Sequence, residues 1–252
     1  MGMSSGSVTQ AMILAAGEGT RLRPLTLETP KVLVPIGGVP LICYTLIWLK
    51  SHGIREVVIN LHHLGEKIKA FLGDGTRFGV SIHYSPEETL LGTAGGVKRA
   101  ERFFSNTFVV VYGDVLTDFN LSDMVRFHQP QKALATLALT KVANPRETGI
   151  VRLDEHDRVV SFVEKPPGGA VAGDMANGGI YILEREIFRF IPDERYCDFA
   201  YEVFPRLVEA GYFVYGYRLR PEDYLVDIGS MEKYRRANED VTAGKVRLRY
   251  GQ

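Results

Sequence analysis

Residues 11–26 read AMILAAGEGTRLRPLT, an apolar run followed directly by a glycine-containing, positively charged loop. The apolar run over 11–15 has the length of a buried strand. Small residues such as Gly17 and Gly19 leave backbone N–H groups unobstructed, so the loop can surround phosphate oxygens. Arg21, and Lys31 beyond the loop, supply the positive charge that a triphosphate requires. The stretch therefore predicts a strand followed by a polyanion-binding loop.

Further apolar runs of strand length recur with helical segments between them. The runs are 57–61, 108–111 and 133–140, while 40–52 and 64–72 end at glycines as helices do. Strands joined by helical crossovers are mostly parallel and are covered by helices on both faces. We predict an α/β fold with a doubly wound, mostly parallel or mixed sheet. Such sheets bind ligands at the carboxyl ends of their strands.

After about residue 140 the apolar segments become shorter, and turn signals such as Asn177-Gly178 separate them. This pattern is typical of a mixed-sheet lobe. Neither a linker nor a long repeat divides the chain. We expect a flexible leader over 1–10, one domain over 11–241 and a C-terminal tail over 242–252.

Composition excludes several classes of protein. Thirty Lys and Arg balance thirty Asp and Glu in 252 residues, whereas a dedicated nucleic-acid binder usually has a basic domain. The longest apolar stretch, 41–49, is far shorter than the roughly 20 residues that span a bilayer. Cys43 and Cys197 form neither a disulfide framework nor a CxxC zinc site. We expect a cytoplasmic protein without membrane or nucleic-acid partners.

Spacing argues against the other familiar phosphate loops. A dinucleotide fingerprint, GxGxxG, needs a third glycine where Leu22 stands, and the next strand ends at Asn60 rather than at an acidic residue. A P-loop needs GxxxxGK followed by Ser or Thr, and Gly17 begins no such run. A GxSxG elbow is absent as well, so we expect direct transfer without a covalent intermediate.

The string GxGTRLRPLT followed by PKxLxP resembles the signature of the sugar-1-phosphate nucleotidyltransferases, also called nucleotide-sugar pyrophosphorylases. The resemblance runs from Ala11 to about Val241. It implies a Rossmann-like, GT-A-like domain in which 11–140 binds nucleotide and 141–241 binds sugar phosphate. It also implies Mg²⁺-dependent attack of a sugar 1-phosphate on the α-phosphorus of an NTP, with release of pyrophosphate. Many guanylyl members carry a C-terminal β-helix, which we do not expect here, and a homodimer is the assembly we consider.

The resemblance assigns catalytic and metal-binding roles. Arg21 would grip the phosphates, Lys31 would neutralise charge at the α-phosphate, and Asp114 and Asp227 would bind Mg²⁺. Independently of the family, Mg²⁺ favours one or two carboxylates with phosphate oxygens and water, and Asp114 follows a buried strand. The expected nucleotide-binding residues are Leu14, Ala16, Gly17, Gly19, Thr20, Arg21, Glu88, Gly92 and Thr93.

The segment LGTAGG over 91–96 resembles the family segment that lies against the nucleobase. Just upstream, Glu87 and Glu88 stand where uridylyl and thymidylyl members carry Gln. A carboxylate only accepts hydrogen bonds, which suits the N1–H and amino group of guanine. We therefore expect GTP and mannose 1-phosphate as substrates. UTP or dTTP with glucose 1-phosphate, UTP with N-acetylmuramate 1-phosphate, a solvated Glu pair and a helix cap at Thr93 remain alternatives.

Residues in the second half resemble the family's sugar-phosphate elements in order and spacing. Gly149 would offer a backbone contact, Glu164 and Asn177 would bind hydroxyls, and Lys165 would bind phosphate. A surface ion pair is the alternative for Glu164 and Lys165. A catalytically silent, nucleotide-sugar-binding homologue is a further alternative, and the joint presence of both phosphate-binding cations and both carboxylates argues against it.

Overall fold

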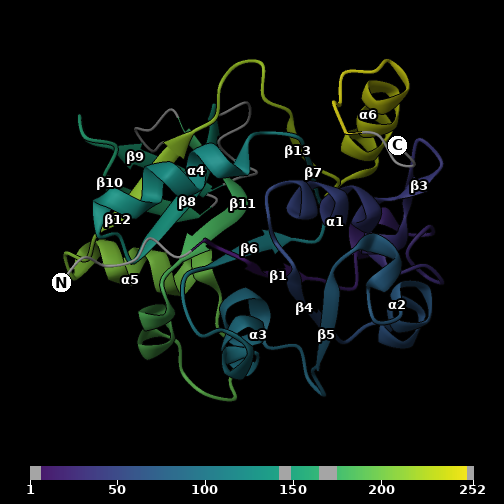
Figure 1. Ribbon diagram of the computed structural model, residues 1–252, viewed down its shortest axis with the longest axis horizontal. Helices are drawn as coiled ribbons and strands as arrows, with labels where there is room; N and C mark the ends of the chain where they lie inside the picture. The colour runs from purple at the N-terminus through teal and green to yellow at the C-terminus, as the bar shows by residue number, and fades with distance from the viewer. Residues whose placement is uncertain (1–6, 142–148, 165–174, 249–252) are drawn as a thin grey trace.

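The computed structural model describes residues 7–141, 149–164 and 175–248, and its central feature is one mixed sheet (Figure 1). Within these residues nine strands follow the order β10-β9-β11-β6-β1-β4-β5, with β8 beside β11 and β12 beside β8. The strands are β1 Gln10–Leu14, β4 Glu56–Leu61, β5 Ser81–Pro86, β6 Phe108–Tyr112, β8 Ala135–Lys141, β9 Gly149–Leu153, β10 Val159–Glu164, β11 Met175–Leu183 and β12 Val214–Arg218.

Four strands, β6-β1-β4-β5, run parallel and carry the first half of the chain. Central β1 pairs with both neighbours, and Ala11 lies opposite Val57 of β4 and Val109 of β6. The sequence pattern does not predict edge strand β5, because exposed polar residues such as Ser81 and His83 interrupt its apolar run. The parallel half is otherwise as predicted.

Strand β11 joins the parallel half to the mixed half. It is antiparallel to β6, β8 and β9, and its pairing with β8 is irregular between Asn177 and Tyr181. Gly179, with φ +72°, lies within that irregularity, a backbone conformation that favours glycine. Strands β9 and β10 are antiparallel, and β12 runs parallel to β8.

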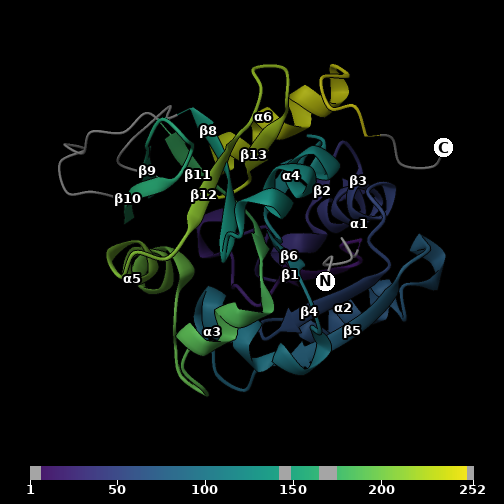
Figure 2. The same ribbon diagram turned by 60° about the vertical axis from the view of Figure 1, so that its left-hand side comes forward.

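Helices cover both faces of the sheet, which confirms the doubly wound prediction. Successive strand residues point to opposite faces, so Ala11 and Ile13 belong to one apolar cluster and Met12 to another. Helices α1, α2 and α4 pack in the first cluster, and α3 and α5 in the second (Figure 2). The helices are α1 Leu41–Ser51, α2 Gly65–Leu72, α3 Gly92–Arg99, α4 Leu121–His128, α5 Phe204–Glu209 and α6 Met231–Thr242.

Smaller elements complete the fold, and a third apolar cluster forms beneath α6. Two-stranded ribbons pair β7 with β13 and β2 with β3. Their strands are β2 Pro35–Ile36, β3 Val39–Pro40, β7 Val115–Thr117 and β13 Leu225–Asp227. Short 3₁₀ turns are Thr20–Leu22, Lys31–Leu33, Thr76–Phe78, Glu101–Phe103, Gln129–Gln131 and Arg185–Phe190, and Phe199–Val203 is a π-helical turn. None of the helices in the described ranges has the length and apolar content needed to cross a bilayer.

Both expected end segments contribute to the fold. Strand β1 begins at Gln10 and Val8 is buried, so the flexible leader does not extend to residue 10 as expected. At the other end Val246 is buried, and Arg247 hydrogen-bonds the Asp118 carboxylate through its backbone N–H and guanidinium. The expected tail is therefore attached to the domain in its described part, up to residue 248.

Candidate active site

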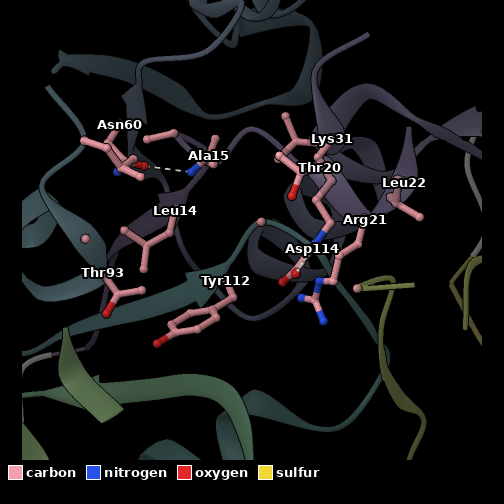
Figure 3. Close-up of a pocket in the computed structure, with 18 of the residues that line it drawn as sticks. Leu14, Ala15, Thr20, Arg21, Leu22, Lys31, Asn60, Thr93, Tyr112 and Asp114 are labelled. Atoms are coloured by element: carbon pink, nitrogen blue, oxygen red, sulfur yellow. Dashed lines mark hydrogen bonds and ion pairs between the residues drawn. The ribbon is translucent and has the colours of Figure 1, made fainter. Parts of the chain in front are cut away.

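A cavity of about 310 Å³ opens at the carboxyl ends of β1, β4 and β6 (Figure 3). Its wall includes Lys31, Asp114 and every expected nucleotide-binding residue except Glu88. Those residues come from the loop after β1, the 3₁₀ turn at Lys31, the start of α3 and the end of β6. The structure therefore brings together segments that are far apart in the sequence.

The glycine loop turns sharply after β1. Gly19 has φ +65°, and a Cβ there would lie 3.0 Å from a methyl group of Thr26. The Thr26 hydroxyl donates to the Gly19 carbonyl over 2.8 Å, which fixes the loop. At the start of the loop, the Ala15 N–H donates to the Asn60 side chain at the end of β4 over 2.7 Å. Asn60, which sequence analysis used only to exclude a dinucleotide site, thus positions the loop.

Gly113 lets the end of β6 approach β1 closely enough to place Asp114 beside the loop. Its N–H donates to the Leu14 carbonyl over 2.9 Å, and a Cβ at this position would lie 2.5 Å from that oxygen. Asp114 then accepts a hydrogen bond from Lys31 Nζ at 2.5 Å, and both side chains are largely buried. Figure 3 shows the Lys31 ammonium directed at the Asp114 carboxylate.

Asp227 lies on the strand next to Asp114. Strand β13 is antiparallel to β7, Asp227 pairs with Val115, and the Ile228 N–H donates to the Asp114 carbonyl over 2.8 Å. The described residues contain no group of three or more His, Cys, Asp or Glu side chains that could hold a metal. A pair of hard carboxylates nevertheless fits Mg²⁺, which takes one or two protein carboxylates together with phosphate and water.

Arg21 lies close to this pair of aspartates. A Cβ on Gly229 would lie 3.1 Å from Arg21 Nη2 and 2.5 Å from Asp227 Oδ1, so both side chains flank the same glycine. Lys31 and Lys233 each pair with a carboxylate. Arg21 forms no ion pair within the described part of the chain, so its guanidinium is available to a phosphate group.

Glu87, rather than Glu88, is the carboxylate that the fold buries beside the cavity. Its Oε1 accepts from Asn60 Nδ2 at 2.7 Å, and its Oε2 accepts from the Leu91 N–H at 3.0 Å. Burial raises the pKa of Glu87, opposed by these hydrogen bonds. Glu88 is exposed and does not line the cavity. The expected contact between Glu88 and the base is therefore absent from this geometry, because the preceding residue takes the inward position.

Glu87→Gln is expected to lower the free energy of unfolding by about 1–3 kcal/mol, because an amide can accept only one of these two hydrogen bonds. Urea denaturation at neutral pH measures the change. Glu88→Gln is the matched control and should leave both the unfolding midpoint and the NTP KM unchanged. Equal effects from the two substitutions would contradict the assigned role of Glu87.

Thr93 lies in the first turn of α3 and is not its N-cap residue. Its hydroxyl donates to Asp198 Oδ2 at 2.9 Å and accepts from the Phe199 N–H at 2.9 Å. Asp198 Oδ1 caps the π-helical turn by accepting from the Ala200 N–H at 2.8 Å. Asp198 lines the cavity, as does Tyr196, and sequence analysis missed both. The detectable signal was an Asp immediately before an apolar helical run.

Three of the four expected sugar-binding residues lie in the described ranges, and they do not line the cavity: Gly149, Glu164 and Asn177. Gly149 and Glu164 are paired opposite each other on β9 and β10. Asn177 lies on β11, and its side-chain oxygen accepts from the Gly179 N–H at 3.1 Å. Lys165 falls outside the described residues.

Two tyrosines connect Asn177 to the cavity. Asn177 Nδ2 donates to the Tyr181 hydroxyl at 2.9 Å, and that hydroxyl donates to the Tyr112 hydroxyl at 3.2 Å. Burial raises the pKa of Tyr112 well above its ordinary value, so its hydroxyl stays protonated. Tyr112 lines the cavity at the end of β6. The hydrogen-bonded hydroxyl groups of the two tyrosines therefore connect the parallel half of the sheet to the mixed half.

Comparison with known proteins identifies the family. The family model described as nucleotidyl transferase matches residues 10–244. This chain belongs to the nucleotidyl transferase family. As a family member it is 37% identical to the UTP–glucose-1-phosphate uridylyltransferase of Synechocystis sp., in an alignment covering 94% of this chain and 64% of that protein. The resemblance stated from the sequence is thereby confirmed.

Two further relatives of this nucleotidyl transferase extend the comparison. The mannose-1-phosphate guanylyltransferase of Mycobacterium tuberculosis is 38% identical, over 93% of this chain and 65% of that protein. The chain thus spans just under two thirds of both curated relatives. A solved structure of a candidate glucose-1-phosphate thymidylyltransferase from Bacillus anthracis superposes with a TM-score of 0.84 at 25% identity, covering 97% of this chain and 98% of that one.

Proposed function

We propose that this nucleotidyl transferase transfers a nucleotidyl group from an NTP to a sugar 1-phosphate, releasing pyrophosphate and forming an NDP-sugar. The observation that carries the proposal is the convergence of Arg21, Lys31 and Asp114 on one cavity beside the glycine loop. Cations and unobstructed N–H groups at strand ends are what a triphosphate requires. The names of the curated relatives point to the same reaction class.

In the proposed reaction, a phosphate oxygen of the sugar 1-phosphate attacks the α-phosphorus of the NTP. One P–O bond forms there, and the bond to the α–β bridging oxygen breaks with its electron pair leaving on pyrophosphate. Arg21 holds the phosphates, and Lys31, on its flexible stem, neutralises charge that shifts during transfer. Catalysis then consists of positioning and charge neutralisation, as in other phosphoryl transfers.

We further propose that Asp114 and Asp227 hold a Mg²⁺ ion. Their backbones are adjacent, and their hard oxygen donors suit this ion. When bound, the ion would orient the phosphates and reduce their charge. Lys31 and Lys233 neutralise the two carboxylates in the structure as described.

The substrate pair that we propose to test first is GTP with mannose 1-phosphate. UTP or dTTP with glucose 1-phosphate and UTP with N-acetylmuramate 1-phosphate are the alternatives. Glu88 is exposed, and both carboxylate oxygens of Glu87 already accept hydrogen bonds from the protein, so the carboxylate argument for guanine no longer holds. This choice therefore rests on the family resemblance alone. Gly149, Glu164, Lys165 and Asn177 remain the proposed sugar-phosphate residues. A homodimer and a cytoplasmic location also remain proposals.

Pyrophosphate release from a grid of NTPs and sugar 1-phosphates with Mg²⁺ tests the proposal. We expect release with one preferred pair, dependence on both substrates, and loss of the signal with EDTA. Omitting the sugar 1-phosphate controls for simple NTP hydrolysis. Absence of release from every pair, combined with calorimetric binding of an NDP-sugar, would replace the proposal with the catalytically silent homologue.

A further inference from the structure

Each of the two proposed metal-binding carboxylates has its own lysine partner. Lys31 Nζ lies 2.5 Å from Asp114 Oδ2, and Lys233 Nζ lies 2.6 Å from Asp227 Oδ2. The family resemblance accounts for Lys31, whereas nothing in the sequence motifs assigned a role to Lys233. The second pair is also the more accessible one, with the Lys233 and Asp227 side chains 37% and 42% exposed.

The local backbone fixes the pair between Lys233 and Asp227. Ser230 caps α6 by accepting from the Lys233 N–H at 3.3 Å, which sets Lys233 in the first turn of the helix. Asp227 Oδ1 accepts from the Gly229 N–H at 3.0 Å, so its Oδ2 is left for the ammonium. Both carboxylate oxygens are therefore engaged. A cation that binds Asp227 through Oδ2 competes with the Lys233 ammonium for that oxygen.

The balance of charge around the two aspartates favours an anion over a lone cation. Arg21 flanks Asp227 without an ion pair in the described ranges, while Lys31 and Lys233 neutralise the two carboxylates. A divalent cation arriving alone meets a surplus of positive charge. A polyphosphate arriving with the cation gives the displaced ammonium groups new partners, because a lysine stem can move its charge to a nearby phosphate.

We propose that Lys233 makes divalent-cation binding conditional on polyphosphate: it occupies Asp227 when nucleotide is absent and transfers to a phosphate oxygen when cation and nucleotide bind together. This inference rests on the proposed function for its metal and its substrate. The Lys233 ammonium repels a cation and attracts an anion, so it should weaken binding of the cation alone and strengthen binding of the polyphosphate alone. Lys233 therefore acts with opposite sign on the two ligands.

Lys233→Met tests this, because it removes the charge and keeps an unbranched chain. Two equilibria are measured on the full chain: Mn²⁺ binding without phosphate, by electron paramagnetic resonance of the free ion, and tripolyphosphate binding in EDTA, by calorimetry. We expect Mn²⁺ affinity to rise and tripolyphosphate affinity to fall, each by about threefold to fivefold, the effect of one partly exposed ion pair.

Two control variants isolate the position and the charge. Lys245→Met breaks another Lys–Asp pair of 2.6 Å, whose Asp240 lies near the opposite end of α6 from Lys233, and should change neither affinity. Lys233→Arg keeps the positive charge and should retain weak Mn²⁺ binding. Mn²⁺ and tripolyphosphate affinities that stay constant, or that change in the same direction in Lys233→Met, would overturn the inference.

The test separates this inference from the proposed function. If the wild type releases pyrophosphate and Lys233→Met lacks the opposite shifts, only the role of Lys233 is wrong. If no substrate pair releases pyrophosphate but the opposite shifts occur, the catalytic proposal fails, and the role of Lys233 in disfavouring the lone cation and favouring polyphosphate still holds.

Discussion

Asp114→Asn is expected to reduce turnover by at least about a hundredfold, the size of effect seen when one electrostatic group is removed from a phosphoryl- or acyl-transfer site. Asparagine matches aspartate in shape but lacks the negative charge that pairs with Lys31 and that the proposed Mg²⁺ requires. The side chain lies at the end of β6 and supports no apolar cluster, so folding should be nearly unchanged. Pyrophosphate release at saturating substrates measures the loss, and thermal unfolding checks the fold.

Asp193→Asn is the matched control for Asp114→Asn. Its side chain is 85% exposed, and Lys98 at 3.4 Å is its only ion-pair partner among the described residues, so both activity and unfolding should match the wild type. If Asp114→Asn kept wild-type turnover with Mg²⁺ present, Asp114 would not belong to the catalytic site, and the proposed Mg²⁺ site would be wrong.

Gly92→Ala is expected to produce the largest loss of stability, about 2–4 kcal/mol, from overpacking added to an unfavourable backbone conformation. Gly92 has φ +76°, and a Cβ there would lie 2.5 Å from the Cys197 carbonyl oxygen. That carbonyl accepts the N–H groups of Ala94 and Gly95 over 3.0 Å each, so it cannot withdraw without losing both hydrogen bonds. The free energy of unfolding in urea measures the effect.

Gly53→Ala separates the two causes, because Gly53 has φ +90° and no atom within 4 Å of a built Cβ. It should cost only about 1–2 kcal/mol, the backbone contribution by itself. If Gly92→Ala and Gly53→Ala destabilised the protein equally, the close contact with the Cys197 carbonyl would contribute nothing to the loss of stability in Gly92→Ala. Loss of nucleotide affinity is expected only in Gly92→Ala, since Gly92 lines the cavity.

The parallel half of the fold could be predicted because its strands are buried on both faces. Such strands are continuous apolar runs, and β1, β4 and β6 lie within about one residue of the ranges expected from sequence. Strand β5 has one exposed face and so lacks that run. The three antiparallel pairings of β11 depend on contacts with strands distant in sequence, and no local pattern in residues 175–183 encodes them.

The residues of the candidate site also fall into those that the sequence predicts and those that it does not. Residues carried by one contiguous motif, such as Gly19, Arg21 and Lys31, could be predicted because the motif spacing fixes them. For Asp198 the local pattern indicates only a helix cap. Its place in the cavity depends on a contact with Thr93 that joins two segments more than a hundred residues apart, so that place could not be predicted. Glu87 and Glu88 are adjacent, and the sequence does not show which of them points inward. In an irregular segment a shift of one residue exchanges the buried and exposed positions, so only the folded structure identifies Glu87 as the buried one.

Strand β11 has a consequence for how the two proposed substrates would meet. Its residues 180–183 pair with β6, and residues 175–176 of the same strand pair with β9. One continuous backbone therefore sets the separation between Tyr112, at the cavity, and Asn177, beside the proposed sugar residues. The two halves cannot close on a short ligand without breaking strand hydrogen bonds. If the proposed function is correct, selection among nucleotide sugars should then depend on molecular length, because β11 holds the two halves at a fixed separation.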